Sequence, residues 1–217
     1  MPPVVSIVGE SKSGKTALIE KLVPELKSRG YRVATVKHAV HGLTFDEPGK
    51  DSWRQAQAGS DAVVISSPDR VVLMRPTAGD LPLDQIARIL GEDCDIILAE
   101  GFKEGSTPKI EVHRKEVGPP LGLIHKLMAI VTDEPLETKK RQFSPQDVKG
   151  LADLLERGFL KPQREQISLY VNSRPIPLSA FPKEIITRVV LAMISCLKGV
   201  GEIRSAEIFL RKEPDQG

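Results

Sequence analysis

The sequence predicts an α/β fold with three layers, in which helices cover both faces of an open, mostly parallel sheet. Two observations predict it. Apolar runs that can form strands alternate along the chain with segments of helical spacing. Residues 96–99 (IILA) form an unbroken apolar run, which is typical of a central strand buried on both faces. In such sheets ligands bind at the carboxyl ends of the strands, so functional residues are expected there.

The first strand, residues 4–8, leads directly into GESKSGKT, residues 9–16, and then into a helix to about Ser28. Two glycines separated by four residues, then Lys and Thr, are the pattern of a phosphate-binding loop. The loop N–H groups and the helix N-terminus would face a phosphate. Lys15 would reach the β- and γ-phosphates, and the Thr16 hydroxyl would bind Mg²⁺. In this strand-to-helix context the motif predicts a P-loop NTPase fold, against the alternative of a chance match in a glycine-rich turn.

The rest of the main domain is predicted from periodicity and turn signals. The two β-branched runs 61–66 and 70–74, separated by Ser67-Pro68-Asp69, predict an inserted β-hairpin. The other predicted elements are a strand at 31–40, a helix from Asp51 or Ser52 to 58, a helix at 81–90, strands at 95–100, 109–113 and 128–132, and a helix at 145–157 capped by Ser144.

A polar segment, residues 161–166, predicts a boundary between a domain of residues 1–160 and a small C-terminal module of residues 166–212. The module has a ββαβ pattern, and fewer than fifty residues are few for independent stability. We therefore expect it to pack on the main domain or on a partner subunit. Its predicted elements are strands at 167–171 and 174–178, a helix at 182–198 and a strand at 203–210.

Composition limits the function classes. A formal net charge of +2 gives no argument for binding a nucleic acid polymer or an anionic membrane. Two cysteines fit neither a metal-ligand spacing nor a disulfide scaffold, and the N-terminus leads straight into a strand without a signal peptide. The longest apolar stretch, residues 185–197, is shorter than the ~20 residues that span a bilayer. We expect a cytoplasmic protein.

Two carboxylates are candidates for the Mg²⁺ and γ-phosphate site. Glu100 closes the apolar strand, where a carboxylate has to leave the core for a polar site. Asp46 follows the second strand in a turn-rich loop and could lie near the γ-phosphate, or could simply form the turn. We therefore expect Lys15, Asp46 and Glu100 to be catalytic, and Thr16 and Glu100 to surround Mg²⁺.

Other side chains allow more than one interpretation. His38 and His41 could bind a metal or an anion, although a zinc site needs four ligands. Trp53 could face a ligand, but is more often a core or interface residue. A basic cluster near the site could meet an anionic partner or could be a solvated surface; it comprises Lys103, Lys109, Arg114 and Lys115.

Asp133 follows a late strand and could accept from the N1–H and N2–H₂ groups of guanine, although the common Asn-Lys-x-Asp pattern is absent. The residues expected to hold the nucleotide are Gly9, Ser11, Lys12, Ser13, Gly14, Lys15, Thr16, Ala17 and Asp133.

Further segments accompany the phosphate loop: TVKH at 35–38, FDEPGKDSWR at 45–54, EGFK at 100–103 and PKIE at 108–111. Together they resemble the molybdopterin-guanine dinucleotide biosynthesis adapter family, MobB, from about residue 4 to 155. The resemblance implies a homodimer that binds GTP and Mg²⁺, hydrolyses GTP weakly and assists the molybdopterin guanylyltransferase. Some related GTPases carry a lysine after the first glycine of the loop, whereas Glu10 stands here.

Two other functions fit the phosphate loop. A P-loop small-molecule kinase would need an arginine-bearing lid, for which Arg70, Arg75 and Arg141 are candidates, although no lid segment stands out. A metallochaperone GTPase would rely on His38 and His41. The C-terminal module lies outside the resemblance and receives no predicted activity.

Overall fold

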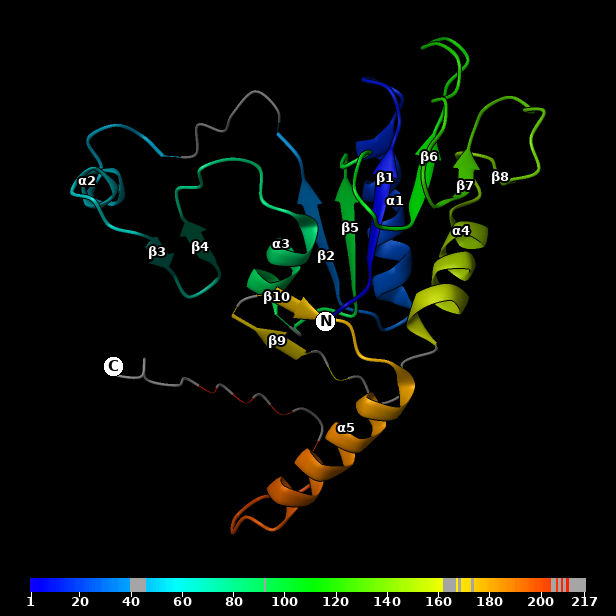
Figure 1. The fold of residues 1–217 in the computed structure, drawn as a ribbon. Coiled ribbons are helices and arrows are strands. Elements are labelled where there is room, and N and C mark those ends of the chain that lie inside the picture. The colour runs from blue at the N-terminus through cyan, green and yellow to red at the C-terminus, as the bar shows by residue number, and fades with distance from the viewer. Residues whose placement is uncertain are drawn as a thin grey trace. The chain divides into compact units, whose positions relative to one another are not determined.

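The computed structural model describes residues 1–39, 46–91, 93–161, 167, 169–172, 174–203, 206, 208 and 210 (Figure 1). The chain divides into two compact units, Met1–Pro162 and Gln163–Gly217. Each unit is described below by itself.

A six-stranded sheet with the order β2-β5-β1-β6-β7-β8 forms the centre of the first unit (Figure 1). Every neighbouring pair in it is parallel, which confirms the predicted α/β fold. The strand β8, Arg141–Phe143, was not predicted, because three residues without an apolar run give no strand signal. The other strands are β1 (Val4–Val8), β2 (Val33–Lys37), β5 (Ile96–Glu100), β6 (Lys109–Val112) and β7 (Leu127–Val131).

Helices lie on opposite faces of this sheet. The helices α1 (Lys15–Ser28) and α4 (Val148–Leu155) share one buried cluster with Ile96 and Leu98 of β5. The helix α3 (Leu83–Leu90) contributes Ala87 to a second cluster, which contains Ile97 of the same strand. Because successive side chains of a strand point to opposite faces, the two clusters lie on the two sides of the sheet. The predicted three layers are therefore present.

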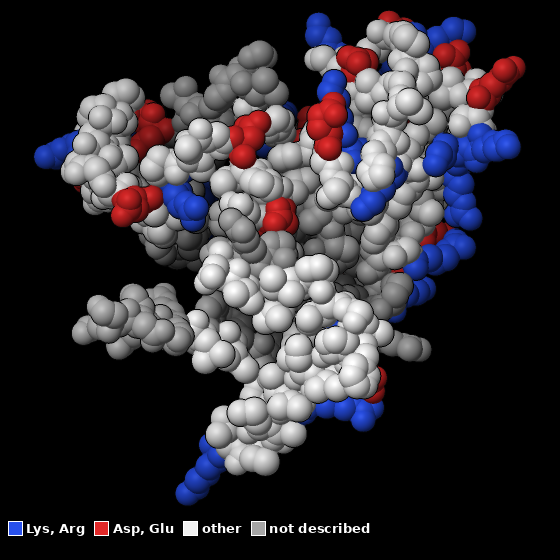
Figure 2. Space-filling model, in the orientation of Figure 1, with Lys and Arg blue, Asp and Glu red and all other residues white. Residues whose placement is uncertain are grey.

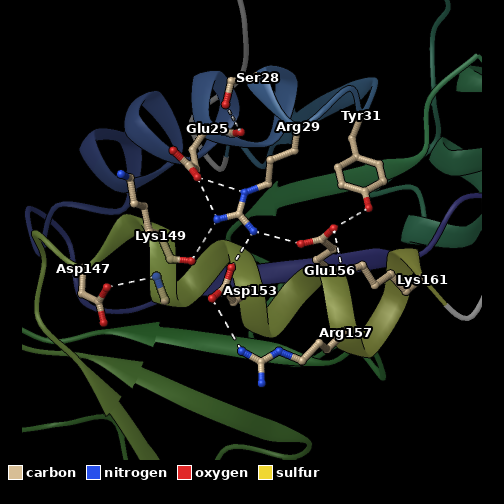
Figure 3. A network of polar contacts seen from close by, with 11 residues as sticks. Glu25, Ser28, Arg29, Tyr31, Asp147, Lys149, Asp153, Glu156, Arg157 and Lys161 are labelled. Atoms are coloured by element: carbon tan, nitrogen blue, oxygen red, sulfur yellow. Dashed lines mark hydrogen bonds and ion pairs between the residues drawn. The ribbon is translucent and has the colours of Figure 1, made fainter.

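A polar network joins the end of α1 to α4 and to the π-helical turn η1, Glu156–Leu160, that follows it (Figure 3). The Arg29 guanidinium lies 2.8 Å from Glu25, 2.6 Å from Asp153 and 3.0 Å from Glu156, and the Tyr31 hydroxyl donates to Glu156 at 2.9 Å. The hydrogen bond from Arg29 lowers the pKa of Asp153. The network fixes the first helix after the phosphate loop to the last helix of the unit.

Two predicted helix caps are wrong. Asp147, not Ser144, caps α4: its carboxylate accepts from the Gly150 N–H at 3.0 Å, because the helix begins three residues later than the sequence pattern suggests. The helix α2 spans Asp51–Gln57 and its N-cap is Lys50, so Asp51 is already a helical residue. An acidic residue in the first turn still suits the positive end of the helix dipole.

The predicted hairpin is confirmed. The strands β3 (Val63–Ser66) and β4 (Val71–Met74) pair antiparallel in a separate two-stranded sheet between α2 and α3. Apolar side chains of this hairpin are largely solvent-exposed. They are Val64, Ile65, Val71 and Leu73.

The second unit contains an antiparallel hairpin, β9 (Leu169–Val171) and β10 (Arg174–Ile176), and the helix α5 (Ala180–Ser195). The predicted strand at 203–210 is wrong where the chain is described: residues 203, 206, 208 and 210 are in no strand. A strand persists only when a neighbour takes up its backbone hydrogen bonds, and these four residues are paired with none. No described residue of this unit is buried, and most of its visible surface is uncharged (Figure 2).

No helix in the described part of the chain is both long enough and apolar enough to cross a membrane.

Candidate functional site

The phosphate-binding loop connects the carboxyl end of β1 to the start of α1. Gly9, Lys12 and Gly14 have φ angles of 150°, 66° and 97°, so the loop turns through backbone conformations that L side chains seldom adopt. A Cβ on Gly9 would lie 2.3 Å from the Val112 carbonyl oxygen of β6 and 2.7 Å from Ser13 Oγ. Only glycine therefore fits where the loop leaves the sheet.

The Lys15 side chain turns back across the loop from the first turn of α1. Its Nζ donates to the carbonyl oxygens of Gly9 at 3.0 Å and Glu10 at 2.7 Å. Partial burial lowers the pKa of the ammonium, while the carboxylates of Glu100 and Glu10 oppose this shift. The cationic head thus lies on the loop itself, and its contact with the β- and γ-phosphates stays a prediction.

Thr16 and Glu100 come together although they are far apart in the sequence. The Thr16 hydroxyl donates to Glu100 Oε2 at 2.8 Å, and the other carboxylate oxygen lies 3.7 Å from Lys37 Nζ of β2. Two neighbouring ligands of an octahedral Mg²⁺ lie about 3 Å apart, given Mg–O distances near 2.1 Å. The hydroxyl and carboxylate oxygens therefore fit a magnesium ion by both chemistry and spacing.

The carboxyl ends of β2 and β5 also bring an aromatic pair to this edge of the sheet. The His38 ring and the Phe102 ring have centroids 4.8 Å apart, and His38 Nε2 lies 3.0 Å from an Asp80 oxygen. The other histidine of the predicted pair, His41, lies outside the described residues. Within those residues, no group of three or more His, Cys, Asp or Glu side chains could hold a metal ion.

β6 carries a row of buried polar side chains on one of its faces. Lys109 is fully buried, and its ammonium donates to the carbonyl oxygens of Gly105, Thr107 and His125. Glu111, 2% exposed, accepts from the Leu121 N–H at 2.6 Å. This β6 polar row (Lys109, Glu111 and His113) holds the segments before and after the strand against the sheet. The prediction of Lys109 as part of a surface cluster is therefore wrong.

The β6 polar row meets the phosphate loop at a small cavity of about 10 Å³. Ser13, 1% exposed, and Glu111 line it, and neither Ser13 Oγ nor Glu111 Oε2 has a hydrogen-bond partner in the described part of the chain. Burial raises the pKa of the Glu111 carboxyl, against the smaller opposite effect of the Leu121 N–H. A polar space of this size is enough for one water molecule.

Asp133 lies at the carboxyl end of β7, close to the segment that follows β6. Its Oδ1 accepts from the Lys115 N–H at 3.0 Å, and its Oδ2 lies 3.6 Å from Arg114 Nη1. The Lys115 N–H and, to a smaller extent, the Arg114 charge lower the pKa of Asp133. The contact of Asp133 with a guanine base stays a prediction.

The Asp46 carboxylate accepts hydrogen bonds close to the start of α2. Its Oδ1 accepts from the Glu47 N–H at 2.9 Å and from the Ser52 hydroxyl at 3.1 Å. These contacts fit the turn-forming interpretation, and its approach to a γ-phosphate stays a prediction. Trp53 of α2 is half-buried. Ser11, Lys12 and Ala17 lie exposed on the loop and the first turn of α1.

Sequence reasoning gave no role to Lys37 and placed Arg114 only in a general basic cluster. The parallel strand order could have placed Lys37 at the site. β2 and β5 are neighbours that end at the same edge of the sheet, with Lys37 opposite Glu100. Arg114 directly follows a strand that pairs with β1, so its proximity to the phosphate loop also follows from the strand order.

Comparison with known proteins places the chain among named relatives. The family model for molybdopterin guanine dinucleotide synthesis protein B matches residues 4–133. A molybdopterin-guanine dinucleotide biosynthesis adapter protein of Haemophilus influenzae is 39% identical over 156 residues, 71% of this chain and 88% of its own. A crystal structure of molybdopterin-guanine biosynthesis protein B superposes with a TM-score of 0.56 at 30% identity, covering 71% of this chain and 98% of that one.

A Methanocaldococcus jannaschii relative, also named for this adapter role, is 26% identical over 238 residues and is matched over 94% of this chain and 96% of its own. That alignment extends beyond the part shared with the Haemophilus relative and into the second unit. On the family model and the Haemophilus relative, the chain belongs to the molybdopterin guanine dinucleotide synthesis protein B (MobB) family.

Proposed function

We propose that this protein is a GTP-binding adapter in molybdenum cofactor biosynthesis, which assists the attachment of GMP to molybdopterin. It binds GTP with Mg²⁺ and hydrolyses it slowly at most. It acts in the cytoplasm as a homodimer, together with the molybdopterin guanylyltransferase.

The contact between Thr16 and Glu100 carries the nucleotide part of the proposal. A hydroxyl from the first turn of α1 and a carboxylate from the end of β5 meet at 2.8 Å beside a glycine-constrained phosphate loop. Lys15 and the loop N–H groups would hold the phosphates, and Thr16 and Glu100 would hold Mg²⁺. The metal would neutralise phosphate charge there.

The adapter part rests on the names of the relatives, several of which are called molybdopterin-guanine dinucleotide biosynthesis adapter proteins. The exposed hairpin supports a dimer. By the strand register, Val64, Val71 and Leu73 lie on one face of the two-stranded sheet and are solvent-exposed, and the exposed Ile65 lies on the other face. A hairpin of two strands has little stability by itself in water. A second copy of the hairpin would cover these side chains.

Calorimetric titration with GTP and ATP, each with and without Mg²⁺, tests the nucleotide part. We expect tighter binding of GTP than ATP, and an increase in GTP affinity with Mg²⁺ that is lost in Thr16→Val. Equal affinity for the two nucleotides would refute the guanine preference. In Lys15→Ala, we expect binding to weaken at least about 100-fold, because a cation that contacts two phosphates is removed.

Product analysis with GTP labelled on the γ-phosphate separates the adapter from a P-loop kinase. Slow release of inorganic phosphate supports the adapter, whereas transfer to a small acceptor supports the kinase. The partner is tested by co-purifying the transferase with the full-length chain, using Val64→Glu/Leu73→Glu as the variant expected to be monomeric. Retention of stoichiometric nickel or zinc through gel filtration would instead favour a metallochaperone.

A further inference from the structure

Arg114 lies over the last loop residue before α1. A Cβ on Gly14 would be 3.5 Å from Arg114 Nη2 and 3.7 Å from its Nε, so the guanidinium is in van der Waals reach of the loop backbone. The side chain is one-third exposed, and it makes no hydrogen bond to another of the described residues. A planar group with five N–H donors is therefore placed beside the phosphate loop with its donors available.

This position brings like charges together. The start of α1 has partial positive charge from its N–H groups, and Lys15 adds a full charge in its first turn. The guanidinium next to Gly14 adds to this positive potential, while Asp133 compensates part of its charge at 3.6 Å. A triphosphate is an anion that this potential attracts, and guanidinium groups bind phosphate oxygens in a bidentate manner.

The segment that carries Arg114 is fixed on both sides of that residue. Before it, His113 Nδ1 lies 3.0 Å from Thr132 Oγ1, and after it the Lys115 N–H donates to Asp133 at 3.0 Å. The Asp133 Oδ2 then faces the guanidinium itself at 3.6 Å. Asp133 thus orients both the backbone next to Arg114 and the Arg114 side chain.

We propose that Arg114 binds the phosphates of the nucleotide in the loop, and that Asp133 is the positioning residue that directs its guanidinium toward them. The inference rests on the proposed nucleotide-binding function and adds to it a residue from the segment that follows β6. It also gives Asp133 a role different from contact with the base.

The test measures the affinities of GTP, XTP and inorganic tripolyphosphate for the full-length chain at constant ionic strength. The variants are Arg114→Gln, Arg114→Lys, Asp133→Asn and the double variant. Lys139→Gln is the control, because it removes one exposed cation that makes no hydrogen bond or ion pair with another described residue. We expect Arg114→Gln to weaken GTP and tripolyphosphate by the same factor, about 10- to 100-fold. The affinity of Arg114→Lys should be intermediate, because lysine keeps the positive charge but cannot make a bidentate contact with phosphate oxygens.

Asp133→Asn separates positioning from base contact. As a positioning residue, it should weaken all three ligands equally, and it should have no further effect in the Arg114→Gln background. A residue that accepts from guanine would behave differently: Asp133→Asn would favour XTP over GTP, because xanthine has a carbonyl where guanine has an amino group, and tripolyphosphate would be unaffected.

That second pattern, or an Arg114→Gln protein that binds GTP and tripolyphosphate within twofold of the parent, would overturn the inference and leave the proposed function intact. If the parent protein bound none of the ligands, the proposed function itself would fail. Melting curves establish that each variant is folded, and Arg114→Lys carries the test if Arg114→Gln does not fold.

Discussion

β5 and β6 lie on the two sides of β1, and they are built differently. β5 is apolar on both faces until it ends in Glu100, whose carboxylate meets Thr16. β6 is equally buried but alternates apolar residues with the β6 polar row, which binds the flanking segments through their backbone groups. One side of the phosphate loop is thus supported by side-chain packing and the other by buried hydrogen bonds.

The difference shows how one loop can serve two kinds of contact. The β5 side presents oxygen atoms suited to a metal ion, and it needs only a rigid strand end to do so. The β6 side presents a cation, Arg114, on a segment outside the sheet, and that segment needs hydrogen bonds to hold its position. Disturbing each side should therefore have different consequences for stability and for binding.

The largest expected effect is on the stability of the β6 side. Lys109→Met should lower the free energy of unfolding by about 2–4 kcal/mol, because three carbonyl oxygens lose a buried charged donor. Ile97→Val on β5 should cost only about 0.5–1.5 kcal/mol. Urea denaturation measures both, and the exposed Lys103→Met is the control. A Lys109→Met protein as stable as this control would contradict the role of the β6 polar row.

The next effect concerns the metal on the β5 side. Glu100→Gln should reduce the Mg²⁺-dependent gain in GTP affinity about tenfold, while the affinity measured in EDTA changes little. Calorimetry with and without Mg²⁺ checks this, with the exposed Glu104→Gln as control. If the affinity fell equally in EDTA, Glu100 would act through the loop and not through a metal ion.

A smaller expected effect is a pH-dependent change in Tm, which concerns Glu111 on the β6 side. The folded-state pKa of Glu111 is raised, so folding retains a proton there, and its contribution to stability is lost as pH rises through that pKa. Glu111→Gln should therefore raise the Tm by about 2–4 °C at pH 8 and have no such effect near pH 4. Glu116→Gln, an exposed change in the same segment, should leave the Tm unaltered at both pH values. A Tm gain at pH 4 as large as at pH 8 would exclude the protonation explanation.

The smallest effect has the opposite sign and lies away from both strands, in the Arg29 network. The pKa values of Asp153 and Glu156 are lowered in the folded state, so the stability they contribute is present at neutral pH and lost as pH falls through those pKa values. Asp153→Asn should lower the Tm slightly at pH 7, less than Glu111→Gln raises it at pH 8. Thermal scans from pH 7 to pH 3 should show the variant and the parent converging in acid.

Local patterns predicted the β5 side well. A loop with two glycines, a lysine and a threonine specifies its own geometry, and four apolar residues before Glu100 identify a buried strand that ends in a polar site. The strand order then places this carboxylate beside Thr16, as observed. These features depend mostly on residues that are close together in the sequence.

The β6 side could not be predicted in the same way. The alternation of Lys109, Ile110, Glu111 and Val112 is also the pattern of a strand with one solvated face, and only the covering segments bury its polar side chains. The pairing of Arg114 with Asp133 depends on β6 and β7 being neighbours. At the four residues described between 203 and 210, the predicted strand is absent for a related reason, because a strand signal does not specify a partner.

The strand order also has a consequence during synthesis. β1 is made first, but its neighbours β5 and β6 begin only at Ile96 and Lys109. At about 5–20 residues per second, a ribosome needs on the order of 5–20 s to reach them. During that interval the nascent β1 has two open edges, and α1, with Leu18, Leu22 and Leu26, is already made and can pack on one of its faces. A chain released before Glu100 would carry the complete phosphate loop with no sheet to hold it.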